Sequence, residues 1–571
     1  MHSGRWHLKY FVLSFCSIAV QAQWFPQFIG GHLTGTSFGI PGRNATYDYV
    51  IIGGRTAGSV VAARLVEGTN ATVAVVEAGT FYELSNGNLS QVPYYSQQYS
   101  GLDWQSHIES GMFTGNRPLH YAQGKNLGGS SGRNPMLYNR GTKGPYDLWA
   151  EEVGDNSYRW DNFFLFFEKS INFTPPDMTL RAANASANYS TQAQQEKSGP
   201  LHVHYPNYAQ PISSYGPEAY AGAGFSPVQD FISGDLNGYN YFAFAIDLDG
   251  NTRSSAETAF FSPAMSSGRL TVYQSSTVRK ILFDRNKRAI GVEIDLPGLQ
   301  PYDLNATKEV ILSAGALRSP QLLMLSEIGL NATMSQLGIP TVSALDFVGQ
   351  NMHDSCAIGG ISFQMTTPSQ TSILSTEEDR IKADEQFRVS GTGPLTNIGA
   401  DFASVNVILV ATTSRGHVTI NSTNVFDQPV IKTNWLSTIA DQEVAVDAYR
   451  RVLSTVENIE ARVGDYTAPN STILSDNTLL LQYIQDEGVG PIHHASITCR
   501  MGREGDATAV VDPKGRVSGV QRLRVIDSSS FGFTPPGHTQ AATYGHTEKL
   551  VTDVIRDGGY ADRWNETVGM G

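Results

Sequence analysis

The clearest pattern of apolar runs and polar turns lies near the start of the chain. Residues 49–52 form a short apolar run, 53–58 read as a turn, 59–66 suit a helix, and 73–76 form a second apolar run. A short apolar run bounded by turn residues is typical of a buried strand. The order strand, turn, helix and strand therefore predicts a βαβ unit.

This unit carries the residue types of a dinucleotide-binding turn. Gly53 and Gly58 bound the turn, Thr56 and Ala57 lie within it, and Glu77 closes the second apolar run. A helix N-terminus can hold a diphosphate, and an acid at the end of the second strand can accept hydrogen bonds from ribose hydroxyls. We expect these five residues to bind a dinucleotide.

Arg55 departs from the usual glycine pattern of such turns. The glycine at this position normally lets the backbone approach the diphosphate, and here it carries a long cationic side chain. Two interpretations compete: the side chain obstructs the dinucleotide, or it points outward, leaves the approach open and adds a phosphate contact. We favour retained binding, with Arg55 among the cofactor residues.

A second glycine cluster spans residues 123–141. Its segment 128–132, GGSSG, formally matches the nucleophile elbow of hydrolases, but the residues before it make a poor strand, which the elbow requires. A loop of glycine and serine followed by Asn134 is better explained by backbone amides that pass close to a flat or anionic ligand. Gly129, Ser130 and Asn134 are therefore predicted cofactor residues.

Two other sequence patterns predict secondary structure but no functional site. The span 270–298 reads as hairpin strands. His202 and His204 flank Val203 on what looks like an alternating strand, yet no further ligand at suitable spacing completes a metal site, so we expect both to be surface histidines.

Composition narrows the class of protein. The chain has 571 residues, 40% of them hydrophobic, a net charge of −13 and 3 cysteines. This length predicts more than one domain with large cores. The acidic balance and the lack of any basic run argue against a nucleic-acid partner, and no stretch is long and apolar enough to span a membrane. The oligomeric state stays open.

The N-terminus predicts export. Residues 1–22 show the basic, apolar and small-residue order of a signal peptide. Eleven Asn-x-Ser/Thr sequons, at Asn44, Asn70, Asn88, Asn172, Asn184, Asn188, Asn305, Asn331, Asn421, Asn470 and Asn565, favour a secreted glycoprotein with N-glycans. We expect a protein of the secretory pathway, bound for the cell exterior, the cell wall or the vacuole. Only Cys356 and Cys499 remain beyond the signal peptide, so one disulfide between them is possible.

Five separated motifs together carry a resemblance to a known family. They are the unit at 47–79, GKNLGGSS at 124–131, SAGALRSPQLLMLSEIGL at 313–330, VGQNMHD at 348–354 and the block from 490 to 554. In this order the chain resembles the glucose-methanol-choline (GMC) flavoprotein oxidoreductases. Its ending FTPPGHTQ is most similar to fungal aryl-alcohol-oxidase-like and secondary-metabolite members.

The resemblance implies a fold. It is α/β, with a Rossmann-like FAD-binding domain of discontinuous segments, here 45–150, 250–345 and 490–571. The substrate-binding domain, α+β with an antiparallel sheet, then takes 151–249 and 346–489. By the same resemblance the main chain at Val278 meets the adenine, and FAD binds noncovalently.

The resemblance also implies an active site. His494 and His538 match the family's pair that faces the flavin ring, Asp527 matches an acid near the cofactor, and Thr539 follows His538 in the same segment. Oxidising an alcohol removes a hydride from carbon and a proton from oxygen, and a neutral imidazole can accept that proton. We assign His494 as the base, His538 as the partner that orients the hydroxyl, and flavin N5 as the hydride acceptor.

Three functions follow in order of support. The first is FAD-dependent oxidation of a primary alcohol of a small aromatic or polyketide-type molecule, with O2 or another acceptor reoxidising the flavin. The second is a non-redox cyclase or lyase on the same fold, in which the histidine pair does acid–base work and the flavin is structural or absent. The third, a binding glycoprotein with a dead site, has least support because both histidines are present.

Overall fold

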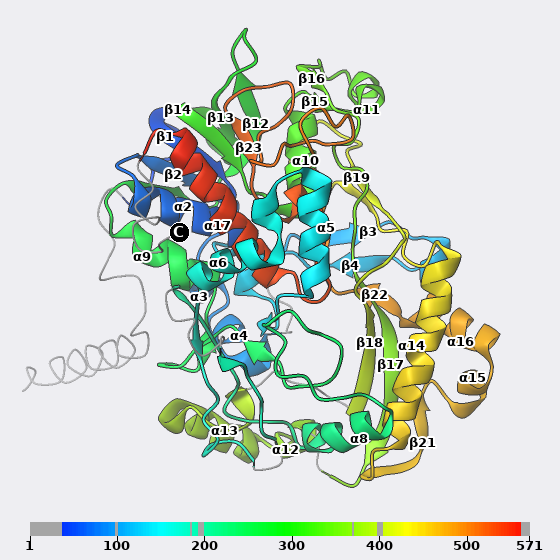
Figure 1. Cartoon of the computed structure of the whole chain (residues 1–571). Helices are drawn as coiled ribbons and strands as arrows, with labels where there is room; N and C mark the ends of the chain where they lie inside the picture. Colours follow the sequence, from blue (N-terminus) through cyan, green and yellow to red (C-terminus); the bar gives the residue numbers. More distant parts are fainter. Residues whose placement is uncertain are drawn as a thin grey trace, which may run out of the picture.

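The structure is a computed structural model (Figure 1). It describes residues 37–96, 101–182, 185–191, 199–367, 370–396 and 403–560. The predicted signal peptide and the sequons at Asn184 and Asn565 lie outside the described residues. Within the described ranges, no helix is both long and apolar enough to cross a membrane.

The largest element is a seven-stranded sheet with the order β11-β2-β1-β14-β13-β12, and β23 pairs with the far end of β14. Strands β11, β2, β1, β14 and β23 run parallel, whereas β13 pairs antiparallel with both β14 and β12. All four residues of β2 are buried, as expected for a parallel strand covered on both faces. The strands are β1 (Ala45–Ile52), β2 (Val73–Val76), β11 (Leu270–Tyr273), β12 (Thr277–Phe283), β13 (Ala289–Asp295), β14 (Tyr302–Leu312) and β23 (Leu523–Val525).

Three helices pack together beside this sheet: α2 (Thr56–Gly68) lies on β1 and β2, and α17 (Gln540–Asp557) packs on both α2 and α6 (Trp160–Ser170). In Figure 1 the red α17 runs beside the blue α2. The side chain of Glu548 on α17 is fully buried and pairs with Arg64 of α2 at 2.7 Å and with Lys169 of α6 at 3.2 Å. Because a buried carboxylate needs partners, this network fixes how the three helices sit.

Two four-stranded sheets and four two-stranded pairs make up the other strands of the described residues. One four-stranded sheet is antiparallel, with β18 (Ala403–Leu409) and β21 (Arg462–Ala468) on either side of β17 (Cys356–Met365), which also pairs with β22 (Val489–Pro491). Helix α14 (Ile439–Glu457) packs against it around a second hydrophobic core. The other sheet has the order β5-β8-β7-β6. The predicted fold class, α/β with a dinucleotide-type domain and a sheet-containing second domain, is confirmed.

The structure has the following further helices and strands. They are α3 (Tyr82–Ser85), α4 (Asn88–Gln91), β3 (Ser106–Ile108), β4 (Leu119–Tyr121), β5 (Leu137–Tyr138), α5 (Lys143–Val153), β6 (Ile171–Thr174), β7 (Leu201–His204), α8 (Gly216–Gly222), β8 (Ala243–Phe244), β9 (Ile246–Asp247), β10 (Thr252–Arg253), α9 (Ser262–Met265), α10 (Gly315–Leu325), β15 (Ile328–Gly329), α11 (Asn331–Gln336), β16 (Ser343–Ala344), α12 (Gln370–Ile373), α13 (Glu377–Ser390), β19 (His417–Thr419), β20 (Val430–Lys432), α15 (Ser471–Ser475) and α16 (Asn477–Tyr483).

Three local predictions are wrong. Helix α2 begins at Thr56, three residues before the predicted start, because Arg55 is extended and serves as its N-cap position. Strand β11 is not part of a hairpin, since it pairs in parallel with β2; the hairpin consists of β12 and β13 alone. His204 is no surface histidine: it is 1% exposed, and burial lowers its pKa to about 3.

The two cysteines do not form a disulfide. Cys356, at the start of β17, and Cys499 are both free and buried. Burial raises the pKa of each thiol.

Candidate active site

The turn between β1 and α2 requires its glycines. Gly53 has φ +93°, and a Cβ there would lie 2.6 Å from the carbonyl oxygen of Ser313. A Cβ at Gly58 would lie 1.9 Å from the carbonyl oxygen of Gly53. Such distances exclude a side chain, so the turn can close tightly against the start of α10 only with glycine at both positions.

One pocket collects four of the predicted cofactor residues. Gly53, Arg55, Glu77 and Val278 all line it, together with Ala314. The Glu77 carboxylate is 2% exposed and accepts hydrogen bonds from the amides of Gly54 and Gly79, each at 2.9 Å. Burial raises the pKa of Glu77. The Glu77 carboxylate therefore also holds the backbone of the turn in place.

Arg55 lies inside this pocket. Its residue is only 8% exposed, and Nη1 donates a hydrogen bond to the carbonyl oxygen of Ala314. The stem of the side chain packs on Gly129, where a Cβ would lie 2.6 Å from the Cβ of Arg55. The outward-pointing arrangement is therefore wrong: the guanidinium forms part of the pocket wall.

The second glycine cluster is a short 3-10 helix, η4 (Gly129–Gly132), with no strand running into it. Gly128 and Gly129 have φ +83° and +56°. The Thr56 hydroxyl donates to the carbonyl oxygen of Gly128 at 3.0 Å, and the Ser130 hydroxyl accepts from the amide of Gly124 at 3.3 Å. This segment therefore lies against the N-terminus of α2 and lacks the geometry of a nucleophile elbow.

Asn134 connects this cluster to the C-terminal block. Its Nδ2 donates to Gln540 Oε1 at 3.0 Å, and its Oδ1 accepts from Arg253 Nη1 at 2.9 Å. Gln540 is the first residue of α17, and Thr539 is the N-cap residue before it. Asn134 and Thr539 therefore lie at the junction that also presents His538.

The predicted histidine pair meets in space. His494 follows β22 and His538 precedes α17, yet His494 Nε2 and His538 Nδ1 lie 3.4 Å apart, with perpendicular rings. At 3.4 Å the hydrogen bond between them is long and weak. The two nitrogens face each other, so a single hydroxyl group can contact both.

Both imidazoles are kept neutral. Burial lowers the pKa of His538 to about 4. Burial, followed by the nearby His538 and His493, lowers the pKa of His494 well below its ordinary value. A neutral imidazole can accept a proton at physiological pH, so the pair is in the state that base catalysis needs.

His494 is held by its backbone. Its Nδ1 is buried and has no hydrogen-bond partner among the described residues, so no carboxylate orients the ring. Instead, Asp354 Oδ1 accepts from the amide of His494 at 3.0 Å, and the Tyr121 hydroxyl accepts from the amide of Ala495 at 2.9 Å. His493, just before, has φ +62°, a conformation that needs such restraint.

Neither Asp354 nor Tyr121 was predicted as a site residue. Asp354 closes the VGQNMHD motif, which supported the resemblance without any assigned role. It is buried, which raises the pKa of its carboxyl group. The ring of His493 packs edge-on against Tyr121 at 5.0 Å, so His493 supports the loop beside the pair.

His538 is fixed from a different side. Asn139 Oδ1 accepts from its amide at 3.2 Å, and the Phe242 ring meets its imidazole edge-on at 5.7 Å. The preceding Gly537 has φ +99°, and a Cβ there would lie 2.4 Å from Asn139 Oδ1. Because Gly537 has no side chain, Asn139 can approach closely and fix the position of His538.

Asp527 connects the dinucleotide pocket to the histidine loop. Its Oδ2 accepts from the amide of Gly315 at 2.7 Å and from the Ser319 hydroxyl at 2.6 Å, at the start of α10. The carbonyl of the next residue, Ser528, accepts from the amide of Ile497 at 3.0 Å, three residues after His494. Asp527 therefore positions both parts of the site.

The residues present fit FAD. Gly53 and Glu77 line one pocket with Val278, which offers it an apolar wall, and Arg55 supplies positive charge where a diphosphate would lie. Gly129, Ser130 and Asn134 continue from that point toward the histidine pair. We assign these residues, with Glu77 at the ribose end, as those that would hold the cofactor.

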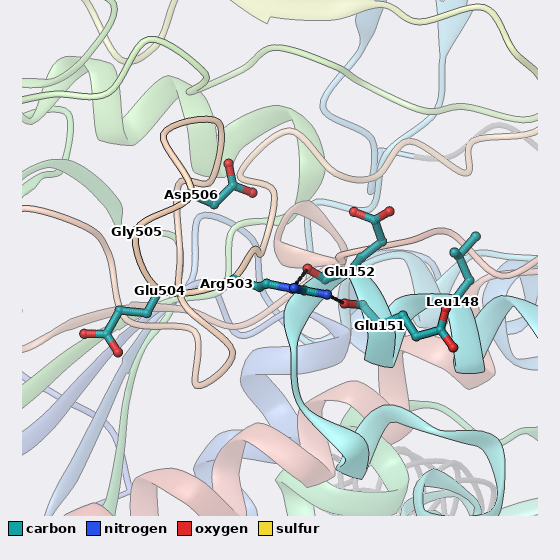
Figure 2. A pocket seen from close by; sticks show the side chains of 7 residues that line it. All are labelled: Leu148, Glu151, Glu152, Arg503, Glu504, Gly505 and Asp506. Carbon is teal, nitrogen blue, oxygen red and sulfur yellow. Dashed lines mark hydrogen bonds between the residues drawn. The ribbon is translucent and has the colours of Figure 1, made fainter.

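A surface depression lies apart from these residues. It is lined by Leu148, Glu151 and Glu152 of α5 and by the loop 503–506 (Figure 2). Arg503 crosses it and donates to the main-chain carbonyls of Glu151 and Glu152, the latter at 3.3 Å. None of the predicted site residues lines this depression.

Comparison with known proteins gives a consistent result. Residues 47–357 and 412–547 match the N-terminal and C-terminal family models described as GMC oxidoreductase. Patulin synthase of Aspergillus clavatus is 38% identical over 91% of this chain and 94% of its own length. Versicolorin B synthase of Emericella nidulans is 37% identical over 91% and 90%.

Solved structures agree on the fold. An FAD-dependent oxidoreductase from Chaetomium thermophilum superposes with a TM-score of 0.83 at 26% identity, covering 90% of this chain and 100% of the other. A fungal aryl-alcohol oxidase gives a TM-score of 0.81 at 22% identity, covering 90% and 99%.

Proposed function

Because this chain belongs to the GMC oxidoreductase family, whose members are FAD-dependent, we propose that it oxidises a primary alcohol of a small aromatic or polyketide-type metabolite. The observation that carries the proposal is the convergence of His494 Nε2 and His538 Nδ1, 3.4 Å apart. The names of its relatives, patulin synthase and versicolorin B synthase, support a place in fungal secondary metabolism.

The histidine pair performs the proton chemistry. The substrate hydroxyl lies beside the pair, within hydrogen-bond distance of both nitrogens; His494 Nε2 accepts its proton, and His538 Nδ1–H donates a hydrogen bond to its oxygen. FAD, when bound, supplies the acceptor for the hydride that leaves the carbinol carbon. Loss of one proton and one hydride turns the alcohol into an aldehyde, and O2 or another oxidant then takes up the two electrons.

A second candidate is a non-redox cyclisation or elimination in which the same pair serves as base and acid. The observation that favours it is the buried Arg55 in the dinucleotide pocket, where a glycine would leave more room for a cofactor. In that case the flavin is structural or absent, and substrate and product have the same oxidation state.

We further propose that residues 1–22 direct the chain into the secretory pathway, where it is N-glycosylated, and that FAD binds noncovalently. Support comes from the sequons: the asparagines at 44, 70, 88, 188, 331, 421 and 470 are all exposed. A glycan can reach the surface at each of them without disturbing the core.

The test is the visible spectrum of the purified, glycosylated protein, recorded anaerobically while a panel of aryl and allylic alcohols is added. We expect a flavin spectrum whose visible absorption band is lost when at least one primary alcohol is added. Conversion of a substrate with an unreduced or missing flavin would support the cyclase or lyase instead.

A further inference from the structure

Arg318 is a buried cation whose partners are all neutral. It lies on α10, is 6% exposed, and lines the same pocket as Arg55. Its guanidinium donates to Gln321 Oε1 at 2.8 Å and to Gln428 Oε1 at 2.6 Å, and lies 4.2 Å from the centre of the Trp104 ring. Its Nε has no hydrogen-bond partner within the described part of the chain.

Within the described chain, Arg318 is a cation of this pocket with no acid beside it. No carboxylate there forms an ion pair with Arg318 or with Arg55. Glu77 and Asp527 lie near Arg55 and favour its charged form, whereas the charged neighbour of Arg318 is Arg55 itself. Burial, and then the charge of Arg55, lower the pKa of Arg318 to about 9.

A buried cation without an acidic partner favours the binding of an anion. Buried charges in proteins are normally paired, because transfer of an isolated ion from water is costly. Two buried arginines of this chain follow the rule: Arg64 pairs with Glu548, and Arg524 pairs with Glu309. Two others, Arg181 and Arg253, are held by main-chain carbonyls instead. Arg318 and Arg55 both line a pocket that a ligand could enter.

The N-terminus of α2 adds to the same field. Helix α2 begins at Thr56 without a side-chain cap, and Arg55, its N-cap residue, lines the pocket. A helix N-terminus carries partial positive charge that favours phosphate groups. We propose that Arg55 and Arg318 together bind the diphosphate of FAD and replace the close backbone approach that a glycine at position 55 would provide.

The test measures FAD release from the purified holoenzyme. Flavin fluorescence after dilution gives the release rate at low and high salt for the native protein, Arg318→Gln, Arg318→Lys and Arg55→Gly. Arg380→Gln is the control, because it removes an exposed arginine of α13 that pairs only with Glu377. None of these readings depends on alcohol oxidation.

We expect Arg318→Gln and Arg55→Gly to release FAD about 10- to 100-fold faster, since each removes a charge-assisted hydrogen bond. Salt should accelerate release from the native protein and affect these two variants less. Arg318→Lys, which keeps the charge, should stay within about 3-fold of the native rate, and Arg380→Gln should match it.

Unchanged release from Arg318→Gln would overturn the role of Arg318. Slower release from Arg55→Gly would show that Arg55 obstructs the cofactor, and would overturn the proposal for that residue. Equal acceleration in Arg318→Lys and Arg318→Gln would show that packing against Trp104 matters rather than charge.

Discussion

A base must be uncharged before it can accept a proton, and burial decides this for both active-site histidines. An imidazole in water would be partly protonated near pH 6.5. Here the surrounding protein disfavours the charged form, so His538 titrates near pH 4 and His494 lower than its ordinary value. The site therefore carries no imidazolium over the physiological pH range.

The rate of flavin reduction by an alcohol should therefore stay level from about pH 6 to pH 8 and fall only at more acid pH, because burial lowers the pKa of the base His494 and lowers that of its partner His538 to about 4. The sign follows from the base: its neutral form is the active one, and a lowered pKa extends that form to lower pH. Stopped-flow reduction at a series of pH values measures this. A midpoint near pH 6.5 would mean that the pair is solvated rather than buried.

The sequence predicted site residues that belong to a motif and missed residues that act by positioning another site residue. The pair His494 and His538 was predicted from the family resemblance, and the acid Glu77 from the βαβ pattern. Arg318, Asp354 and Tyr121 were not, because each acts on a segment far away in the sequence: Tyr121 bonds an amide 374 positions further on. No local spacing encodes such a contact.

At the level of strands and loops, the loop before β17 fixes the position of the loop after β22. Strand β17 pairs with β22 through Cys356 and Pro491, and Asp354, two residues before β17, reaches the amide of His494, three residues after β22. The pairing of these two strands therefore sets where the base lies. Asp354 is a positioning residue in this arrangement.

Replacing Asp354 by Ala should lower kcat about 10- to 100-fold with little change in KM, because a small displacement of a base costs a large factor in rate. Asp354→Asn should keep most of the activity, since an amide oxygen can still accept from His494, and burial already disfavours the charged carboxylate. Steady-state kinetics, with FAD content as the folding control, decides this. Equal losses in both variants would show that the role of Asp354 depends on its charge.

The elements themselves were predictable where the apolar pattern was continuous. Strands β1 and β2 match apolar runs because both are buried in a parallel sheet. The start of α2 was misplaced because its first turn consists of Thr, Ala and Gly, which carry no helical periodicity. Strand β11 looked like part of a hairpin because a strand's partner is decided by the whole sheet and not by its own sequence.

For the whole molecule, the active site lies where segments from most of the chain meet. The turn after β1, the glycine cluster near 130, the start of α10, the loop after β22 and the start of α17 each contribute. Composition and a resemblance could predict this fold class. They could not predict the charge of the cofactor pocket, which depends on two arginines 263 positions apart being placed in one cavity.

The central claim is that His494 is the base in an FAD-dependent alcohol oxidation. The most direct measurement is anaerobic stopped-flow reduction of the bound flavin by an alcohol, in the native protein and in His494→Gln. We predict the same flavin spectrum in both and a reduction rate about 100- to 10,000-fold lower in the variant. A variant that reduces its flavin at the native rate, with FAD fully bound, would contradict the account.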